Sequence, residues 1–160
     1  MKRIVALLME NQPGALSRVV GLFSQRGYNI ESLIVAPTED PSLSRLTMTT
    51  TGDEKVIEQI TKQLNKLIDV VKVLDLGESD HVERELMLVK LGREEITNDD
   101  ILKLDGRVVF ENSDIVNIQF VGDSKNLDQI VKKLDSKNTL EIVRTGASGI
   151  SSNTQTLTIK

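Results

Sequence analysis

Two spacings of apolar residues succeed each other along the chain, and each change of spacing marks the boundary of a predicted element. Residues 3–9 are an almost unbroken apolar run, which is typical of a central strand covered on both faces. Leu16, Val19, Val20 and Phe23 follow at the i, i+3, i+4 and i+7 positions of a helix with one apolar face. The pattern therefore predicts a buried strand and then an amphipathic helix that ends near residue 26.

The same two spacings continue through the rest of the first half. Apolar and β-branched residues at 28–36 and 43–51 predict two strands, and turn-forming residues at 37–42 separate them. Asp53 is expected to cap a second helix, and a strand follows at 70–76. The predicted order is strand, helix, strand, strand, helix, strand, which is the βαββαβ arrangement.

A polar joint at 77–80 precedes a second, similar cycle. Residues 149–160 are polar and are expected to be loose until a short apolar run at 156–159. The chain therefore reads as two α+β domains of ferredoxin-like βαββαβ order, 3–77 and 82–160, each an antiparallel sheet with helices on one face. The elements predicted in the second domain are strands at 82–91, 107–111, 115–121 and 139–144, with helices at 93–104 and after Asp123-Ser124.

This topology leaves two surfaces of the first domain in need of partners. Right-handed crossovers place both helices on one face of the sheet, so Ile4, Ala6 and Leu8 point to the other face. We expect another domain or subunit to cover them. The strand at 28–36 falls at a sheet edge, where a long apolar strand is expected to pair with its copy in a second chain.

Composition narrows the classes of function. The 160-residue chain is 39% apolar and 28% charged, with a net charge of −4 and a sequence pI of about 5.1. An acidic chain with three phenylalanines, one tyrosine and no tryptophan lacks the cationic surface and stacking platforms of a nucleic-acid binder. The absence of cysteine excludes disulfides and thiolate chemistry. No signal peptide or membrane span is visible, so the cytoplasm is the expected location.

No catalytic or metal-binding constellation emerges, so we expect that the chain is not an enzyme by itself. His81 is the only histidine and is interpreted as a solvated linker residue. Glu94-Glu95 and Asp99-Asp100 are interpreted as solvated charges at helix ends. The run Arg144-Thr-Gly-Ala-Ser-Gly lacks the Gly-Lys-Ser/Thr ending of a phosphate-binding loop.

The turn between the first strand and the first helix is where the sequence predicts a binding site. Pro13 lacks an amide donor and suits a first helical turn, whereas Gly14 lets a ligand or a backbone approach closely. The unpaired amides of a helix N-terminus attract a carboxylate or a phosphate.

Several motifs make this chain resemble a known family. Asn11-x-Pro-Gly-Ala-Leu-Ser-Arg-Val and Arg26-Gly-Tyr-Asn-Ile-Glu-Ser-Leu resemble the ACT domain, and more narrowly the small regulatory subunits of acetohydroxyacid synthase (acetolactate synthase). Val35-Ala-Pro-Thr, Leu43-Ser-Arg and His81-Val-Glu-Arg-Glu-Leu-Met-Leu-Val-Lys fit the same family. The resemblance is strong from residue 3 to about 90 and weaker beyond, and the segment 91–105 departs from the family pattern.

The resemblance implies a regulatory subunit rather than a catalyst. Members of the family dimerise through side-by-side ACT domains and bind a branched-chain amino acid, usually valine, at that interface. They activate a separate large catalytic subunit of acetolactate synthase and confer feedback inhibition on it. No cofactor is expected in this chain, whereas the catalytic partner is expected to use thiamine diphosphate, Mg²⁺ and FAD. The segments 82–91 and 144–149 are candidates for contacting that partner.

The chemistry of an amino-acid effector then assigns roles within the turn. Amides near Gly14, Ala15 and Leu16 are expected to receive the carboxylate, and Asn11 and Asn29 to orient the charged groups. The side chain of Ile30, from the edge strand of the second copy, is expected to receive the isopropyl group. The predicted effector-binding residues are Asn11, Pro13, Gly14, Ala15, Leu16, Asn29 and Ile30.

Two other functions compete with this interpretation. A free-standing ACT module that binds an amino acid, such as a transcriptional or translational regulator, would show the same turn. RNA-recognition domains share the βαββαβ order, but the predicted sheet here lacks their aromatic pairs and the chain is acidic.

Overall fold

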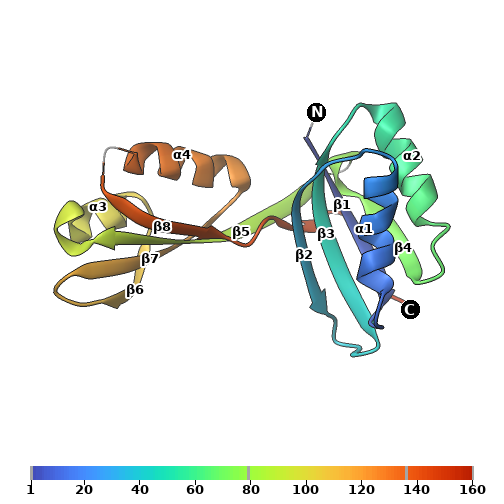
Figure 1. The fold of residues 1–160 in the computed structure, drawn as a ribbon, viewed down its shortest axis with the longest axis horizontal. Helices are drawn as coiled ribbons and strands as arrows, with labels where there is room; N and C mark the ends of the chain where they lie inside the picture. The colour runs from blue at the N-terminus through green and yellow to red at the C-terminus, as the bar shows by residue number, and fades with distance from the viewer. Residues whose placement is uncertain (1, 79, 136, 160) are drawn as a thin grey trace. The chain divides into compact units, whose positions relative to one another are not determined.

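The structure is a computed structural model that describes residues 2–78, 80–135 and 137–159. The described residues form two compact units (Figure 1). Unit 1 comprises those of Met1–Val82 together with those of Ala147–Lys160, and unit 2 comprises those of Glu83–Gly146. The chain therefore passes between the units twice. Ser79 of the predicted joint and the last residue of the predicted tail lie outside the described residues.

Unit 1 has the predicted βαββαβ order. Its four strands form an antiparallel sheet in the order β2-β3-β1-β4, so β2 lies at an edge, as the sequence predicts. A short 3₁₀ turn, η1 (Leu76–Glu78), follows the last strand. The elements are β1 (Lys2–Glu10), α1 (Ala15–Gln25), β2 (Ile30–Pro37), β3 (Leu43–Thr51), α2 (Glu54–Leu64) and β4 (Val70–Asp75).

Both helices of unit 1 pack on one face of this sheet. Val19 and Phe23 of α1 and Ile60 and Leu64 of α2 share one buried cluster with the inward-facing residues of the strands. Asp53 caps α2 as predicted, because its carboxylate accepts a hydrogen bond of 2.9 Å from the amide of Val56. The apolar periodicity of the two helices thus determines which face of the sheet they cover.

The other face of β1 is covered by the C-terminal segment of the same chain. Ile4, Ala6 and Leu8 are almost completely buried and form a cluster with Leu76 and Leu157. The covering segment lies within the second domain predicted at 82–160, but it packs as part of unit 1, because the chain returns to that unit after residue 146.

Two side-chain bonds hold the returning segment in unit 1. Arg45 donates a hydrogen bond of 2.7 Å to the carbonyl of Gly149, and Lys72 donates one of 2.6 Å to the carbonyl of Thr156. A short strand, β9 (Ser148–Ser151), opens the segment, and the run at 156–159 is not a strand. The segment therefore begins with a strand, and its later part packs on the sheet through one buried residue, Leu157.

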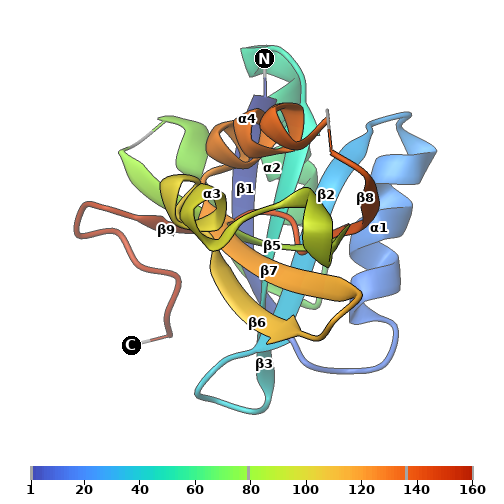
Figure 2. The same ribbon diagram turned by 90° about the vertical axis from the view of Figure 1, so that its left-hand side faces the viewer.

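Unit 2 repeats the topology, as predicted. Its strands have the order β6-β7-β5-β8, and Figures 1 and 2 show α3 and α4 on one side of them. His81, expected in a solvated joint, is half-buried at the start of β5. The elements are β5 (His81–Gly92), η2 (Arg93–Glu95), α3 (Asn98–Lys103), β6 (Arg107–Glu111), β7 (Ile115–Gly122), α4 (Ser124–Leu134) and β8 (Thr139–Arg144).

The predicted helix at 93–104 is shorter than expected. Ile96 and Thr97 are not helical, and they divide the segment into a single 3₁₀ turn and the six-residue α3. Thr97 and Asp100 form a capping box, in which each side chain accepts a hydrogen bond from the backbone of the other residue. The strong cap at Thr97 starts the helix there and leaves room for one buried apolar residue, Ile101.

Candidate functional site

The turn predicted to bind a ligand connects β1 to α1. Gly14 occupies the N-cap position with φ +87°, a left-handed conformation that a side chain disfavours. The amide of Ala15, one of the three expected to receive a carboxylate, already donates to the carbonyl of Gln12 at 3.2 Å. Among the described residues, the amides of Gly14, Leu16 and Ser17 have no acceptor. The turn therefore presents free donors at the positive end of the α1 dipole.

A cation that the sequence analysis did not assign stands beside this turn. The Nε and Nη2 atoms of Arg18 donate to the carboxylate of Asp69, whose side chain is 6% exposed. A Cβ added to Gly14 would lie 2.9 Å from Nη1 of Arg18, so that atom lies against the glycine. Within the described part of the chain, Nη1 has no acceptor. Arg18 therefore adds a positive charge and two free N–H donors next to the unpaired amides.

The ion pair fixes both charges. The hydrogen bond from Arg18 is the main cause that lowers the pKa of the Asp69 carboxyl below its ordinary value, and Asp69 raises the pKa of Arg18 in return. The carbonyl of Asp69 also accepts a hydrogen bond of 2.8 Å from the amide of Glu10, at the end of β1. Asp69 thus ties the Arg18 guanidinium to the strand that leads into the turn.

The remaining residues of the predicted turn divide between structural and exposed positions. Asn11 is exposed, and its side-chain amide donates to the carbonyl of Pro41 at 2.9 Å, so its nitrogen stabilises the β2–β3 loop. Ala15 is buried in the core, whereas Pro13 and Leu16 are exposed. The side chain of Leu16 is thus available to a ligand or a second chain.

Asn29 and Ile30 lie at the opposite end of α1. The carbonyl of Asn29 accepts a hydrogen bond of 2.6 Å from Thr50, and Ile30, half-buried, begins β2. Because α1 has 11 residues, about 16 Å of helix separates them from Gly14 within one chain (Figure 1). A single copy therefore does not bring Asn29 and Ile30 to the predicted turn.

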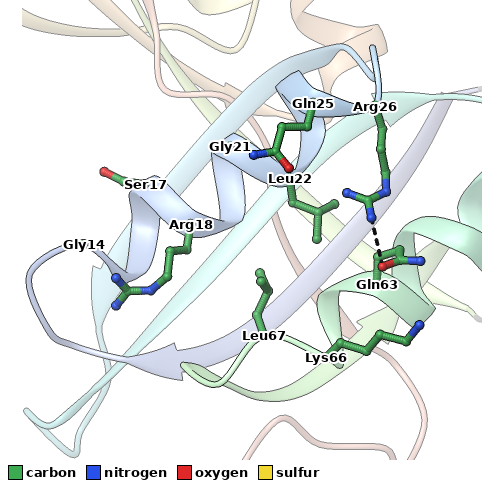
Figure 3. A pocket seen from close by; sticks show the side chains of 10 residues that line it. All are labelled: Gly14, Ser17, Arg18, Gly21, Leu22, Gln25, Arg26, Gln63, Lys66 and Leu67. Carbon is green, nitrogen blue, oxygen red and sulfur yellow. Dashed lines mark hydrogen bonds between the residues drawn. The ribbon is translucent and has the colours of Figure 1, made fainter.

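A groove of about 530 Å³ begins at Gly14 and runs between α1 and the end of α2 (Figure 3). Arg18, Arg26 and Lys66 contribute its positive charges, and Leu22 and Leu67 contribute apolar surface. No local sequence pattern indicates this groove, because its two walls come from segments about 40 residues apart in the sequence.

The Arg144 motif serves a structural purpose within unit 2. Arg144 donates two hydrogen bonds of 2.8 Å to Glu85, whose side chain is 4% exposed, and one of 2.6 Å to Asp128. The amide of Gly146 and the hydroxyl of Ser124 donate to the same Glu85 carboxylate. The residues that resemble a phosphate loop are therefore already bound to a carboxylate of the chain itself.

Burial alone would raise the pKa of the Glu85 carboxyl, but the hydrogen bonds and charge of Arg144, with Ser124 and Gly146, lower it below its ordinary value.

Among the described residues, no group of three or more His, Cys, Asp or Glu side chains is placed to hold a metal ion. Within the same residues, every helix is too short or too polar to span a bilayer.

The topology and the glycine turn define a class of protein. A βαββαβ sheet of order β2-β3-β1-β4, with two helices on one face and a glycine at the start of the first helix, is the ferredoxin-like fold of an ACT domain. Unit 2 has the same ferredoxin-like order.

Comparison with known proteins places the chain within one family. Residues 5–72 match the family described as "AHAS small subunit-like ACT domain", and residues 84–153 match "Small subunit of acetolactate synthase". The acetolactate synthase isozyme 3 small subunits of Salmonella typhimurium and Escherichia coli are 52% and 51% identical over 158 residues, covering 94% of this chain and 96% of each relative. The crystal structure of the acetolactate synthase small subunit from Thermotoga maritima has a TM-score of 0.85 at 34% identity and covers 97% of this chain and 99% of its own. The chain belongs to the family of acetolactate synthase small subunits.

Proposed function

We propose that this chain is the regulatory subunit of acetolactate synthase, which activates a large catalytic subunit and confers feedback inhibition by valine. Family membership supports the regulatory role, since relatives about half identical over nearly their whole length are acetolactate synthase small subunits. Acetolactate chemistry then belongs to the catalytic subunit, with its thiamine diphosphate, Mg²⁺ and FAD. This chain contributes binding energy and geometry rather than reacting groups.

The observation that carries the sensor role is the cluster of unpaired donors at the α1 turn. The unpaired amides of Gly14, Leu16 and Ser17 and the Nη1 edge of Arg18 lie at the same turn, and both kinds of donor suit a carboxylate. The backbone amides and the guanidinium select the carboxylate that all amino acids share. The apolar surface of Leu16 and of Ile30 selects an aliphatic side chain.

The proposed effector site requires two copies of the chain. β2 pairs only with β3 among the described strands, so its outer edge has unpaired backbone groups along eight residues. Side-by-side pairing of two β2 edges would bring Asn29 and Ile30 of one copy toward the turn of the other. Ligand binding and subunit association would then be one linked equilibrium.

The decisive test is reconstitution with the large subunit from the same organism. Adding this chain is expected to raise the rate of acetolactate formation, and valine is expected to reverse that increase. Calorimetry with valine, leucine and isoleucine on the isolated chain identifies the preferred effector, and sedimentation measures the dimer. Valine binding without any effect on a large subunit would instead favour a free-standing amino-acid-binding regulator.

A further inference from the structure

The groove between α1 and α2 in unit 1 has an electrostatic character opposite to that of the chain. Three of its lining side chains are cations, Arg18, Arg26 and Lys66, and no described aspartate or glutamate lines it, although the net charge of the chain is −4. Figure 3 shows these side chains along the length of the groove rather than at one point. The groove is thus a local concentration of positive charge on an acidic protein.

Little of this charge is neutralised inside the molecule. Arg18 is bound to Asp69, but Arg26 donates only to the neutral amide of Gln63, at 3.1 Å. Lys66 is exposed, and among the described residues its side-chain ammonium has no hydrogen-bond or ion-pair partner. The positive charges of Arg26 and Lys66, and the free Nη1 edge of the Arg18 guanidinium, therefore face the groove.

The residues that line the groove favour an extended chain segment over an enclosed small molecule. Ligand pockets are mostly apolar and enclose their ligand, whereas only Leu22 and Leu67 supply apolar side chains here, and three of the lining side chains are long cations. Ile68, the residue after Leu67, is 90% exposed and offers an apolar contact beside the groove. Gly21 lies in the wall of the groove and leaves it open, since nothing lies within 4 Å of a Cβ added there.

We infer that this groove binds an acidic, extended segment of the catalytic subunit. The inference rests on the proposed function, because it assigns the activation of the catalytic subunit to one surface of unit 1. Charge complementarity identifies the kind of partner: carboxylates of the segment pair with Arg26 and Lys66, while an apolar residue contacts Leu67 or Ile68. The proposed effector turn adjoins one end of the same groove through Gly14 and Arg18.

Gly21 provides a test that leaves the fold undisturbed. Its backbone is helical and a side chain there meets open space, so substitution introduces no clash. Gly21→Glu places a negative charge in the groove, Gly21→Gln adds the same volume without charge, and Gly21→Lys adds a positive charge. Lys66→Glu removes a groove cation, and Lys55→Glu, on the exposed surface of α2 outside the groove, is the matched control of equal charge change.

The measurement is the small-subunit concentration that half-activates the full-length large subunit, at about 50 and 200 mM KCl. We expect Gly21→Glu and Lys66→Glu to raise this concentration by about tenfold or more. We also expect them to weaken its dependence on salt, whereas Lys55→Glu behaves like the wild type. Gly21→Lys should activate at a lower concentration than Gly21→Gln. Retained valine binding by the variants shows that unit 1 is folded.

The outcomes separate this inference from the proposed function. If the wild type activates and both groove variants activate at the same concentration, the groove is not the docking surface, and the regulatory role stands. If Gly21→Gln and Gly21→Glu fail equally, bulk rather than charge determines docking, and the acidic partner is wrong. If the wild type activates no matched large subunit, the proposed function fails and the inference fails with it.

Discussion

Truncating Leu157 to alanine should detach the end of the C-terminal segment without unfolding unit 1. Within residues 152–159, Leu157 is the single buried residue, at 5% exposed, and it contacts the outer face of β1. Burying a leucine side chain contributes about 1.5–3 kcal/mol, and the entropy lost on ordering the segment offsets part of that. Because the segment can leave the sheet while the helix-side core stays intact, we expect Leu157→Ala to lower the free energy of unfolding by about 1–2 kcal/mol.

The same truncation at Leu64 provides the comparison. Leu64 is completely buried between α2 and the sheet, so the chain cannot avoid the cavity by local detachment. Leu64→Ala should therefore cost about 2–5 kcal/mol, the usual range for a core leucine. Leu157→Met, which nearly conserves volume, should cost less than Leu157→Ala.

Urea denaturation followed by circular dichroism measures the two losses, because the chain has no tryptophan and a single tyrosine. Hydrogen exchange across residues 152–159 tests detachment directly. Trypsin is unsuited to this purpose, since no lysine or arginine lies between Arg144 and Lys160. Equal losses for Leu157→Ala and Leu64→Ala, with the amides of 152–159 still protected, would refute the view that this segment is a separable cover.

Three further predictions concern the turn and the ion network. Gly14→Asp should abolish valine binding in calorimetry while the circular dichroism spectrum is retained. The new carboxylate lies beside Nη1 of Arg18, where it pairs with that cation and repels the carboxylate of the effector. Asn29→His should weaken valine binding, and wild-type affinity in both variants would move the site elsewhere. The pKa of Glu85 in the folded protein lies below its ordinary value of 4.5. The folding stability that the ionised carboxylate contributes is therefore present above pH 4.5 and is lost as the pH falls through the folded pKa. Glu85→Gln should lower the free energy of unfolding by about 1–3 kcal/mol at pH 7. Below about pH 5, the variant should lose stability less steeply than the wild type, and parallel pH profiles of the two proteins would exclude this role for Glu85.

The parts of the fold that follow from local spacing were predictable from the sequence. The helix around Val19 and Phe23, the cap at Asp53 and the edge position of β2 depend on patterns within a few residues or on the order of elements. The start of α3 was also readable in retrospect, since Thr97 and Asp100 have the spacing of a capping box. The helix was predicted over 93–104 even though Ile96 and Ile101 do not keep helical spacing, and the structure divides that segment at Ile96 and Thr97.

The features that the sequence did not predict depend on contacts between distant residues. Arg18 and Asp69 are 51 positions apart, and nothing local indicates that they pair. Leu157 reaches β1 from the other end of the chain, where a polar composition predicts a loose tail. A polar segment with one leucine has no periodicity, so only the tertiary structure shows that this leucine covers Ile4 and Leu8.

The shared position of Gly14 and Arg18 connects the two proposed binding events quantitatively. Both residues lie at the proposed effector turn and line the end of the groove, so a ligand that rearranges this turn would also change the groove. If valine weakens docking of the catalytic subunit by some factor, docking must weaken valine binding by the same factor, because linkage is reciprocal. Calorimetry of valine into the isolated chain and into the preformed complex measures that factor. Equal valine affinities would show that inhibition does not act through docking. Inhibition would then act on the catalytic rate of the assembled complex, to which reciprocity does not apply.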